Sequence, residues 1–287
     1  MDSKITDLDG DKWDVSITAS RGYLSVNIRE LWRYRDLLMM FVKKDIITVY
    51  KQTILGPLWF VIQPMLTTLM FVFVFGNIAK IGTDGVPQVL FYLGSITMWN
   101  YFSETLNVTS KTFTENAAIF GKVYFPRLIL PLSKVVSGLM KFFIQFGLFL
   151  IVWLYYLFVK KSIQPNIYIL LIPVLLAVMA ALSLGFGLFI TSVTTKYRDL
   201  AFLVAFGVQL LMYATPVIYP LSSVHNHRIL LWLNPLTALF ETFKYAFFGN
   251  GIFDVQWLLY SVAFTTVLLI SGVIIFNKVE RGFIDTV

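Results

Sequence analysis

The sequence contains few residue patterns that could support catalysis or metal binding. It has no cysteine and two histidines, His225 and His227, which lie two positions apart with no further ligand beside them. The aspartates at alternate positions from Asp7 to Asp11 resemble the start of a calcium-binding loop, but Lys12 occupies the position where that loop needs glycine. We therefore expect no metal site and no resident cofactor in this chain.

A motif for binding nucleotides is also missing from the sequence. The pair Gly121-Lys122 is followed by Val123 and lacks the upstream glycine of a phosphate-binding G-x-x-x-x-G-K-[ST] loop. If the protein uses ATP and Mg²⁺, a separate subunit must bind them. The best enzymatic alternative is an integral membrane glycosyltransferase or acyltransferase, but no pair of buried acids and no nucleophile with its base can be recognised.

The elements that must carry any function are long apolar helices. Hydrophobic residues make up 57% of the 287 residues and charged residues only 14%, a composition that a single water-facing domain could not bury. A helix needs about 20 apolar residues to cross a bilayer core of roughly 30 Å. We predict an all-α, polytopic membrane protein with six transmembrane helices. The six stretches run over 58–78, 88–106, 142–159, 167–193, 200–219 and 255–277.

Polar residues in two of these stretches refine the prediction. The second stretch includes Asn100 and Glu104, so we expect it to face other helices or a wet path instead of lipid. The third is expected to start after Lys141, because Lys134 and Lys141 would each cost about 3 kcal/mol at the bilayer centre. Hardly any other charges lie within the six stretches, which argues against an ion channel with a charged selectivity filter.

Lysine and arginine are distributed unevenly over the connections between these stretches. Eighteen of them fall in the segments on one side of the membrane and five on the other. Because cytoplasmic connections carry the excess of basic residues, both termini are expected in the cytoplasm. The chain then divides into a cytoplasmic leader, residues 1–57, and a transmembrane domain, residues 58–287. This domain contains a long cytoplasmic connection, 107–140, and a long outer one, 220–254.

The leader is predicted to contain an amphipathic helix at the membrane surface. Asn27 can cap it, with Glu30 three residues later as in a capping box. Apolar side chains recur at steps of three and four, and charged side chains form another stripe. The apolar stripe consists of Leu31, Tyr34, Leu38, Val42, Ile46 and Val49. A passive anchor on anionic lipid and a docking site for a cytoplasmic partner explain such a helix equally well.

Five segments resemble one family of membrane proteins. They are ELWRYRDLL at 30–38, YKQTILGPLWFVIQPMLTTLMFVFVFG at 50–76, FTENAAIFGKVYFPRLILPLS at 113–133, TKYRDL at 195–200 and LNPLTALFETFKYAFFG at 233–249. In order and spacing they closely resemble the permease subunits of ATP-binding cassette exporters for bacterial polysaccharides. This family includes the O-antigen, teichoic acid and capsule exporters. The resemblance covers nearly the whole chain from about Arg21 onward.

The resemblance makes the connection at 107–140 the segment that couples the membrane domain to a separate ATPase. Short helices are expected at 117–122 and 126–133, bounded by Gly121 and Pro126. The turn at 196–199 is a weaker second contact. A solvated interfacial loop is the alternative for the whole segment. The side chains expected to dock on the ATPase are Phe120, Lys122, Tyr124, Phe125, Arg127, Tyr197 and Arg198.

The outer connection is too apolar for a loop in water. The segments 229–233 and 236–248 are predicted to form two short helices, split by Asn234-Pro235 and too short to cross the membrane. We expect them to be re-entrant or to lie at the outer interface. The resemblance gives them the role of an external gate that includes Asn234, Pro235, Glu241 and Lys244. Glu241 and Lys244 fit an ordinary structural pair at i, i+3 equally well.

Aromatic side chains are suitable surfaces for a sugar polymer, because the CH faces of sugars stack on their rings. For any single ring, a place in a membrane belt or in helix packing is the better explanation, so the prediction concerns the set. The candidates for a translocation path are Trp59, Phe60, Phe71, Tyr92, Trp99, Tyr101, Tyr213 and Tyr219.

The resemblance also implies the assembly and the cargo. It implies a homodimer with the conduit between protomers and two ATPase subunits that bind ATP and Mg²⁺. The implied cargo is a lipid-linked polysaccharide of the O-antigen type, moved across the bacterial inner (cytoplasmic) membrane. Export of teichoic acid or capsular polymer, or of small lipids or drugs on the same scaffold, is the alternative. Apart from these partners we expect membrane lipid and no nucleic acid.

Overall fold

The computed structural model describes residues 28–51, 56–120, 125–194, 199–224 and 228–283. In these ranges the chain is helical, as predicted, and forms no strand. The α-helices are α1 (Ile28–Arg33), α2 (Arg35–Lys51), α3 (Trp59–Phe71), α4 (Gln88–Thr109), α5 (Thr112–Phe120), α6 (Ile129–Tyr155), α7 (Ile172–Thr194), α8 (Leu200–Tyr213), α9 (Arg228–Trp232), α10 (Pro235–Phe248) and α11 (Val255–Phe283).

Four helical segments of the described chain are long and apolar enough to cross a membrane. They are Gly56–Ile78, Ile129–Lys160, Ile167–Thr194 and Val255–Val279. The first two extend α3 and α6 by π-helical turns at Val72–Ile78 and Tyr156–Lys160, and the third begins with a 3-10 turn ahead of α7. These segments correspond to the first, third, fourth and sixth predicted spans.

The other two predicted spans are helices of a different kind. α4 has 22 residues and is buried among other helices along most of its length, which confirms that the second stretch faces protein. α8 has only 14 residues. It ends at Tyr213, earlier than the predicted Tyr219, because Pro216 follows closely and the residue before a proline avoids helical backbone angles.

The beginning of α6 also differs from the prediction. The helix starts at Ile129, so Lys134 and Lys141 lie inside it and not ahead of it. Each lysine finds a carboxylate on a neighbouring helix. Lys134 Nζ lies 2.8 Å from each carboxylate oxygen of Asp45 in α2, and Lys141 pairs with Glu104 in α4. Because paired charges cost far less to bury than isolated ones, the helix can include both lysines.

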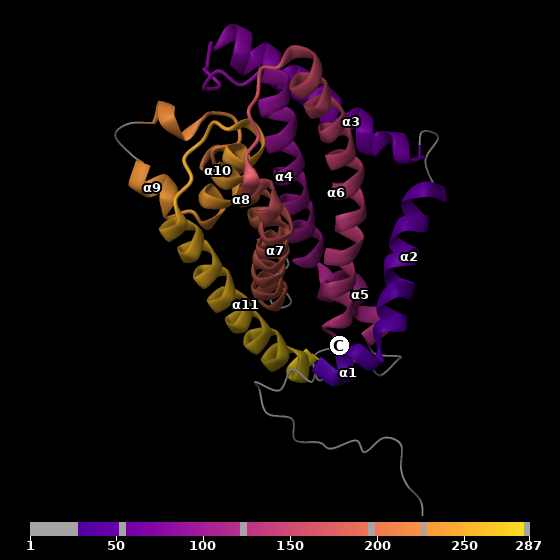
Figure 1. The fold of residues 1–287 in the computed structure, drawn as a ribbon. Coiled ribbons are helices and arrows are strands. Elements are labelled where there is room, and N and C mark those ends of the chain that lie inside the picture. Colours follow the sequence, from indigo (N-terminus) through magenta and orange to yellow (C-terminus); the bar gives the residue numbers. More distant parts are fainter. Residues whose placement is uncertain (1–27, 52–55, 121–124, 195–198, 225–227, 284–287) are drawn as a thin grey trace, which may run out of the picture.

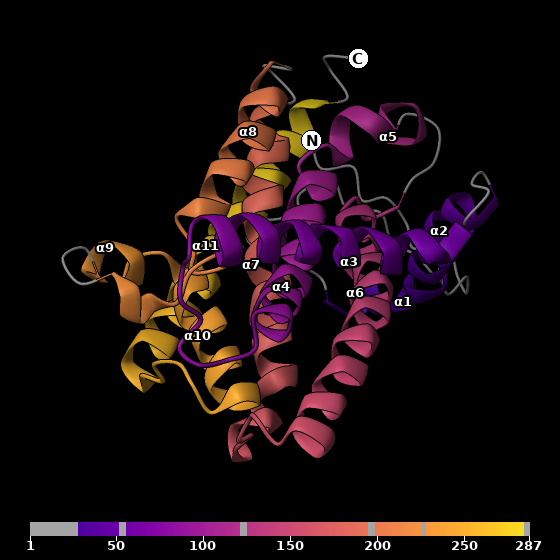
Figure 2. The same cartoon turned by 90° about the horizontal axis from the view of Figure 1, so that it is seen from above.

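The predicted amphipathic helix of the leader is present as α1 and α2, with a break at Tyr34. Its predicted apolar stripe faces the protein: Val42 is buried, and Leu31, Tyr34 and Leu38 are half-buried. The charged stripe, which includes Arg33 and Lys43, is exposed. α2 runs beside α6 in both views (Figures 1 and 2) and is joined to it by the Lys134–Asp45 ion pair.

The core is centred on α4, between α6, α7 and α10 (Figure 1). Close contact here depends on Gly94, where an added Cβ would lie 2.9 Å from the Phe149 ring and 3.0 Å from the Phe243 ring. α7 and α11 also approach closely, since a Cβ at Gly272 would lie 2.7 Å from the carbonyl oxygen of Gly185. At one end of the bundle lie α1, α5 and the end of α11, and α9 and α10 lie toward the other (Figure 1).

Candidate functional site

The short helix α5 and the turn before it are fixed to the end of the bundle by three contacts. The Phe113 amide donates a hydrogen bond to Thr191 Oγ1 at 3.2 Å, and Thr194 Oγ1 donates to the Ser110 carbonyl oxygen at 3.2 Å. The Phe113 ring stacks on Phe276 of α11, with centroids 4.6 Å apart and planes 14° apart. A force applied to α5 would therefore reach both α7 and α11.

α5 lies in the connection at 107–140, which the resemblance assigns to coupling. The helices of this connection have other bounds than predicted. The helix expected at 117–122 begins earlier, at Thr112, and Asn116 has non-helical angles within it. The helix expected at 126–133 is the first part of α6. In its described residues the connection is therefore largely helical, with Thr112 and Phe113 buried against the bundle.

Only two of the predicted docking side chains lie in the described part of the chain. Phe125 and Arg127 are both buried within the protomer, and Phe125 contacts Phe41 of α2 at 6.0 Å between ring centroids. Their burial indicates that they support the segment from within, and their docking role stays a prediction. The remaining five fall outside the described residues or side chains: Phe120, Lys122, Tyr124, Tyr197 and Arg198.

The other end of the bundle contains the two short helices that the sequence predicts around Asn234-Pro235. Asn234 caps α10 by accepting a hydrogen bond from the Leu236 amide at 3.1 Å, and Pro235 occupies the first turn. The Asn234 amide also donates to the Ala214 carbonyl oxygen at 3.1 Å and to Thr215 Oγ1 at 2.9 Å. The break between α9 and α10 is thus tied to the end of α8.

Glu241 and Lys244 form a buried ion pair on α10, and their role in a gate stays a prediction. Lys244 Nζ lies 3.0 Å from Glu241 Oε1, donates to the Pro216 carbonyl oxygen at 2.6 Å, and sits 4.5 Å from the centroid of the Phe91 ring. Glu241 Oε2 accepts from the Ile252 amide at 3.2 Å. Burial lowers the pKa of Lys244, and the neighbouring Glu241 carboxylate partly offsets this shift. The pair therefore joins α10 to α4 and to the chain after α8.

The eight predicted path aromatics do not share one surface of the protomer. Tyr92, Trp99 and Tyr101 are buried in the core around α4, where Tyr101 packs against Phe142. Phe60, Phe71 and Tyr219 are half-buried. Trp59 on α3 and Tyr213 on α8 are the two exposed members, at 45% and 56%. A polymer could reach these two rings without disturbing the core.

Sequence reasoning missed the partners that fix the ends of the bundle. The Phe113–Phe276 stack joins residues far apart in the chain, and no periodic pattern indicates it. The need for the pairs Lys134–Asp45 and Lys141–Glu104 could have been recognised in the sequence. A lysine within an apolar helix needs a carboxylate nearby, and acidic residues are scarce in the membrane domain.

The chain is similar to known proteins along most of its length. The family model for the ABC-2 type transporter matches residues 36–248. O-antigen export system permease protein RfbA of Myxococcus xanthus is 27% identical over 263 residues, which is 91% of this chain and 98% of that protein. A protein of the same name from Klebsiella pneumoniae is 26% identical over 254 residues, 87% of this chain and 94% of that protein. Capsule polysaccharide export inner-membrane protein CtrC of Neisseria meningitidis serogroup A is 24% identical over 260 residues, 83% of this chain and 89% of that protein.

The helices and their packing define a polytopic α-helical membrane protein, with a short helix packed onto one end and a buried helix at the other. The family model covers well over half of the chain. The chain therefore belongs to the ABC-2 type transporter family, and it is a transporter permease and not an enzyme.

Proposed function

We propose that this chain is the transmembrane subunit of an ATP-driven exporter that moves a lipid-linked polysaccharide of the O-antigen type across the bacterial inner membrane. The observation that carries the proposal is similarity along almost the full length of two proteins named as O-antigen export permeases. The capsule relative is more distant in sequence and makes capsular polymer the second candidate.

ATP binding and hydrolysis belong to two copies of a separate ATPase subunit, which hold ATP and Mg²⁺. The sequence of this chain has no phosphate-binding loop, which supports a separate motor. The contacts of α5 with Thr191 and Phe276 support the coupling role of this end, because they connect a peripheral helix to two long ones. Docking of the ATPase on α5 moves these contacts and thereby α7 and α11.

The permease works as a homodimer with the conduit between two protomers. The surface of α8 supports this assembly, since Phe202 is 82% exposed and Phe206 and Tyr213 are also exposed. Gln209 is exposed on the same helix. An amide facing lipid would lack hydrogen-bond partners, so a partner protomer or a wet path beside α8 suits it better.

Both ends of the chain face the cytoplasm, as the distribution of lysine and arginine favours. Single cysteines test this orientation cleanly, because the chain has none of its own. A membrane-impermeant maleimide added to intact cells should label Lys161→Cys beyond α6 and leave Glu115→Cys in α5 unlabelled. Both side chains are exposed in the protomer. Labelling of Glu115→Cys from outside would contradict the orientation.

The cargo is tested by purifying the permease with its ATPase and measuring nucleotide turnover. A lipid-linked glycan should stimulate turnover, and a small amphiphile of similar charge should not. Stimulation by the small amphiphile alone would favour small-lipid or drug export. Comparing O-antigen and capsular glycans in the same assay separates the two polymer candidates.

A further inference from the structure

The connection between α3 and α4 contains a tight turn that presents an aspartate to solvent. The Val86 amide donates to the Thr83 carbonyl oxygen at 3.0 Å, and the residues between them, Asp84 and Gly85, have φ angles of 50° and 81°. Positive φ at both central positions is the geometry of a type I′ turn, which Asp-Gly adopts readily. Thr83 Oγ1 secures the turn by donating to the Val86 carbonyl oxygen at 2.6 Å. The turn therefore fixes the position of the exposed Asp84 side chain.

Asp84 contacts two segments that are distant from it in the chain. Ser222 Oγ, in the 3-10 turn Leu221–Ser223 after α8, lies 2.6 Å and 2.7 Å from the two carboxylate oxygens of Asp84. Asn250 Nδ2, just after α10, donates to the Asp84 carbonyl oxygen at 2.7 Å. The two segments flank α9 and α10, so Asp84 holds the chain on both sides of the predicted gate helices. We name Asp84, Ser222 and Asn250 the outer clasp.

The outer clasp is linked to the buried pair Glu241–Lys244. Ile252, two residues after Asn250, donates its amide to Glu241 Oε2 at 3.2 Å. Burial lowers the pKa of Lys244, and the carboxylates of Glu241 and Asp84 both oppose this shift. The charge of Asp84 therefore acts on the buried ammonium, so that a closed clasp stabilises α10 where it lies.

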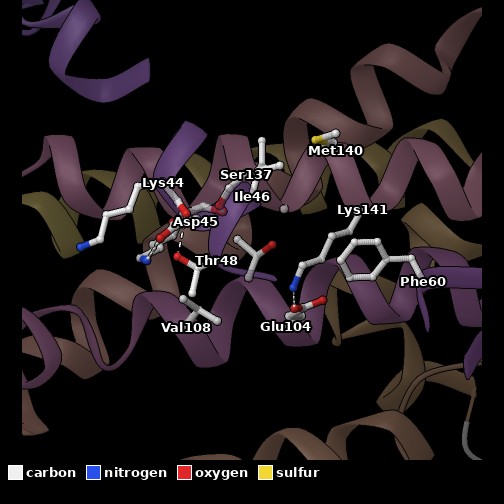
Figure 3. A pocket seen from close by; sticks show the side chains of 13 residues that line it. Lys44, Asp45, Ile46, Thr48, Phe60, Glu104, Val108, Ser137, Met140 and Lys141 are labelled. Carbon is white, nitrogen blue, oxygen red and sulfur yellow. Dashed lines mark hydrogen bonds and ion pairs between the residues drawn. The ribbon is translucent and has the colours of Figure 1, made fainter. Parts of the chain in front are cut away.

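The outer clasp differs from the ion pairs between the long helices. In the cavity between α2, α4 and α6, Lys141 pairs with Glu104, and such a pair holds two long helices together (Figure 3). The clasp residues all lie between α-helices, in connections that can separate without unwinding one. Asp84 and Asn250 are exposed and Ser222 is half-buried, so water can replace their hydrogen bonds. Such bonds contribute little net stability, which suits a contact that opens and closes.

We propose that the outer clasp closes the outer end of the permease at rest and opens when polymer leaves, with Asp84 positioning both flanks of α9 and α10. The proposal rests on the proposed function in one respect, the assignment of this end of the bundle to the side where polymer leaves. A turn that only orders the outer connections would make the same contacts but would not have to open during export.

The first test measures how often the clasp opens, and it needs no cargo. Leu221 is fully buried beside Ser222, and the chain has no cysteine of its own. A Leu221→Cys permease should therefore react with an impermeant maleimide only when this segment moves away from the bundle. Asp84→Asn keeps the turn, because asparagine also favours positive φ, but removes the charge. It should raise the labelling rate of Leu221→Cys about two- to fivefold.

Two further variants make the labelling test decisive. Ser222→Ala removes the hydroxyl that bonds to Asp84 and should raise the labelling rate in the same way, even if Asp84→Asn does not fold. Asp254→Asn is the matched control and should leave the rate unchanged. Its carboxylate lies in the connection between α10 and α11 and accepts from the Gln256 amide at 2.8 Å, a local contact that asparagine can also make.

The second test locks the clasp during transport. In the double variant Asp84→Cys/Ser222→Cys, a short bifunctional thiol reagent that reductant can cleave bridges the two side chains. Export of a lipid-linked glycan by the permease and its ATPase should stop in the bridged protein and return on reduction. The two single-cysteine variants, treated with the same reagent, should continue to export.

Unchanged labelling in both Asp84→Asn and Ser222→Ala would overturn the proposal. Normal export by the bridged protein would also overturn it, since a clasp that stays closed during transport has a structural role alone. Because labelling does not depend on cargo, it decides whether Asp84 holds these segments even if the wild type moves no glycan. That last outcome would contradict the proposed function and not the clasp.

Discussion

Lys244 Nζ lies 3.0 Å from Glu241 Oε1 and 2.6 Å from the carbonyl oxygen of Pro216, so one buried ammonium joins α10 to the chain after α8. Both side chains are almost inaccessible, at 3% and 2% exposure. The predicted outer gate is therefore built around an internal ion pair. Any movement of α10 relative to the chain after α8 must preserve the hydrogen bond from Lys244 to the Pro216 carbonyl oxygen or remove one partner from the buried ammonium.

Removing one member of this pair should destabilise the protein severely. Lys244→Met leaves Glu241 buried without its partner, which costs about 3–5 kcal/mol. The midpoint of thermal unfolding in detergent should fall well below that of the exposed control Lys160→Met. The double variant Lys244→Met/Glu241→Leu should recover most of the loss, because no lone charge remains. Full stability of Lys244→Met alone would contradict the buried pair.

Two helix glycines should respond in opposite ways to alanine. A Cβ at Gly187 of α7 would lie 2.5 Å from Thr109 Cβ of α4, so Gly187→Ala overpacks the contact and costs about 1–3 kcal/mol. Gly147 of α6 has open space around it. Gly147→Ala should be neutral or stabilise the helix by up to about 1 kcal/mol. Equal melting temperatures for the two variants would show that α4 and α7 are not in such close contact.

The stack of Phe113 on Phe276 should transmit the work of the ATPase. Phe276→Leu keeps an apolar side chain of smaller size and removes about 1 kcal/mol of ring contact. We expect the ATPase to co-purify as with the wild type, while polymer export and glycan-stimulated turnover both decrease. Phe143→Leu, at an exposed position of α6, is the control. Normal export by Phe276→Leu would remove this contact from the coupling route.

The exposed and buried path aromatics should behave differently. The double variant Trp59→Ala/Tyr213→Ala should reduce export but change the free energy of unfolding by less than about 0.5 kcal/mol, because both rings are exposed. Tyr101→Ala should instead lower stability by about 3–5 kcal/mol, since this ring is in the core. Tyr155→Ala serves as an exposed control outside the predicted path. Unchanged export by the double variant would argue that neither ring contacts cargo.

The sequence was sufficient to predict features that depend on local chemistry. The length of an apolar stretch decides whether a helix can span the bilayer, and Asn234-Pro235 supplies both a cap and a first-turn proline. The recurrence of apolar residues in the leader correctly predicted a helix with an apolar and a charged face, with Val42 buried and Lys43 exposed. That the apolar face packs on the protein was not predicted from the sequence.

Features that depend on distant partners could not be predicted in this way. Lys141 was expected to lie ahead of the third membrane span, but Glu104 in another helix removes most of the cost of burying this lysine. Tyr92 and Tyr101 were selected for their ring chemistry, which does not determine the side of the helix on which the core lies. For Glu241 and Lys244 the spacing was recognised, and only the fold reveals that both are buried.

The central claim is that this permease exports a lipid-linked polymer only with a separate ATPase. The most direct measurement follows ATP-dependent transfer of a lipid-linked glycan across the membrane of liposomes that contain the purified permease. With the ATPase and ATP, the glycan should become inaccessible to a glycosidase added on the side of the ATPase, and a hydrolysis-deficient ATPase should abolish this protection. Equal transfer by the permease alone, without ATPase or nucleotide, would contradict the account.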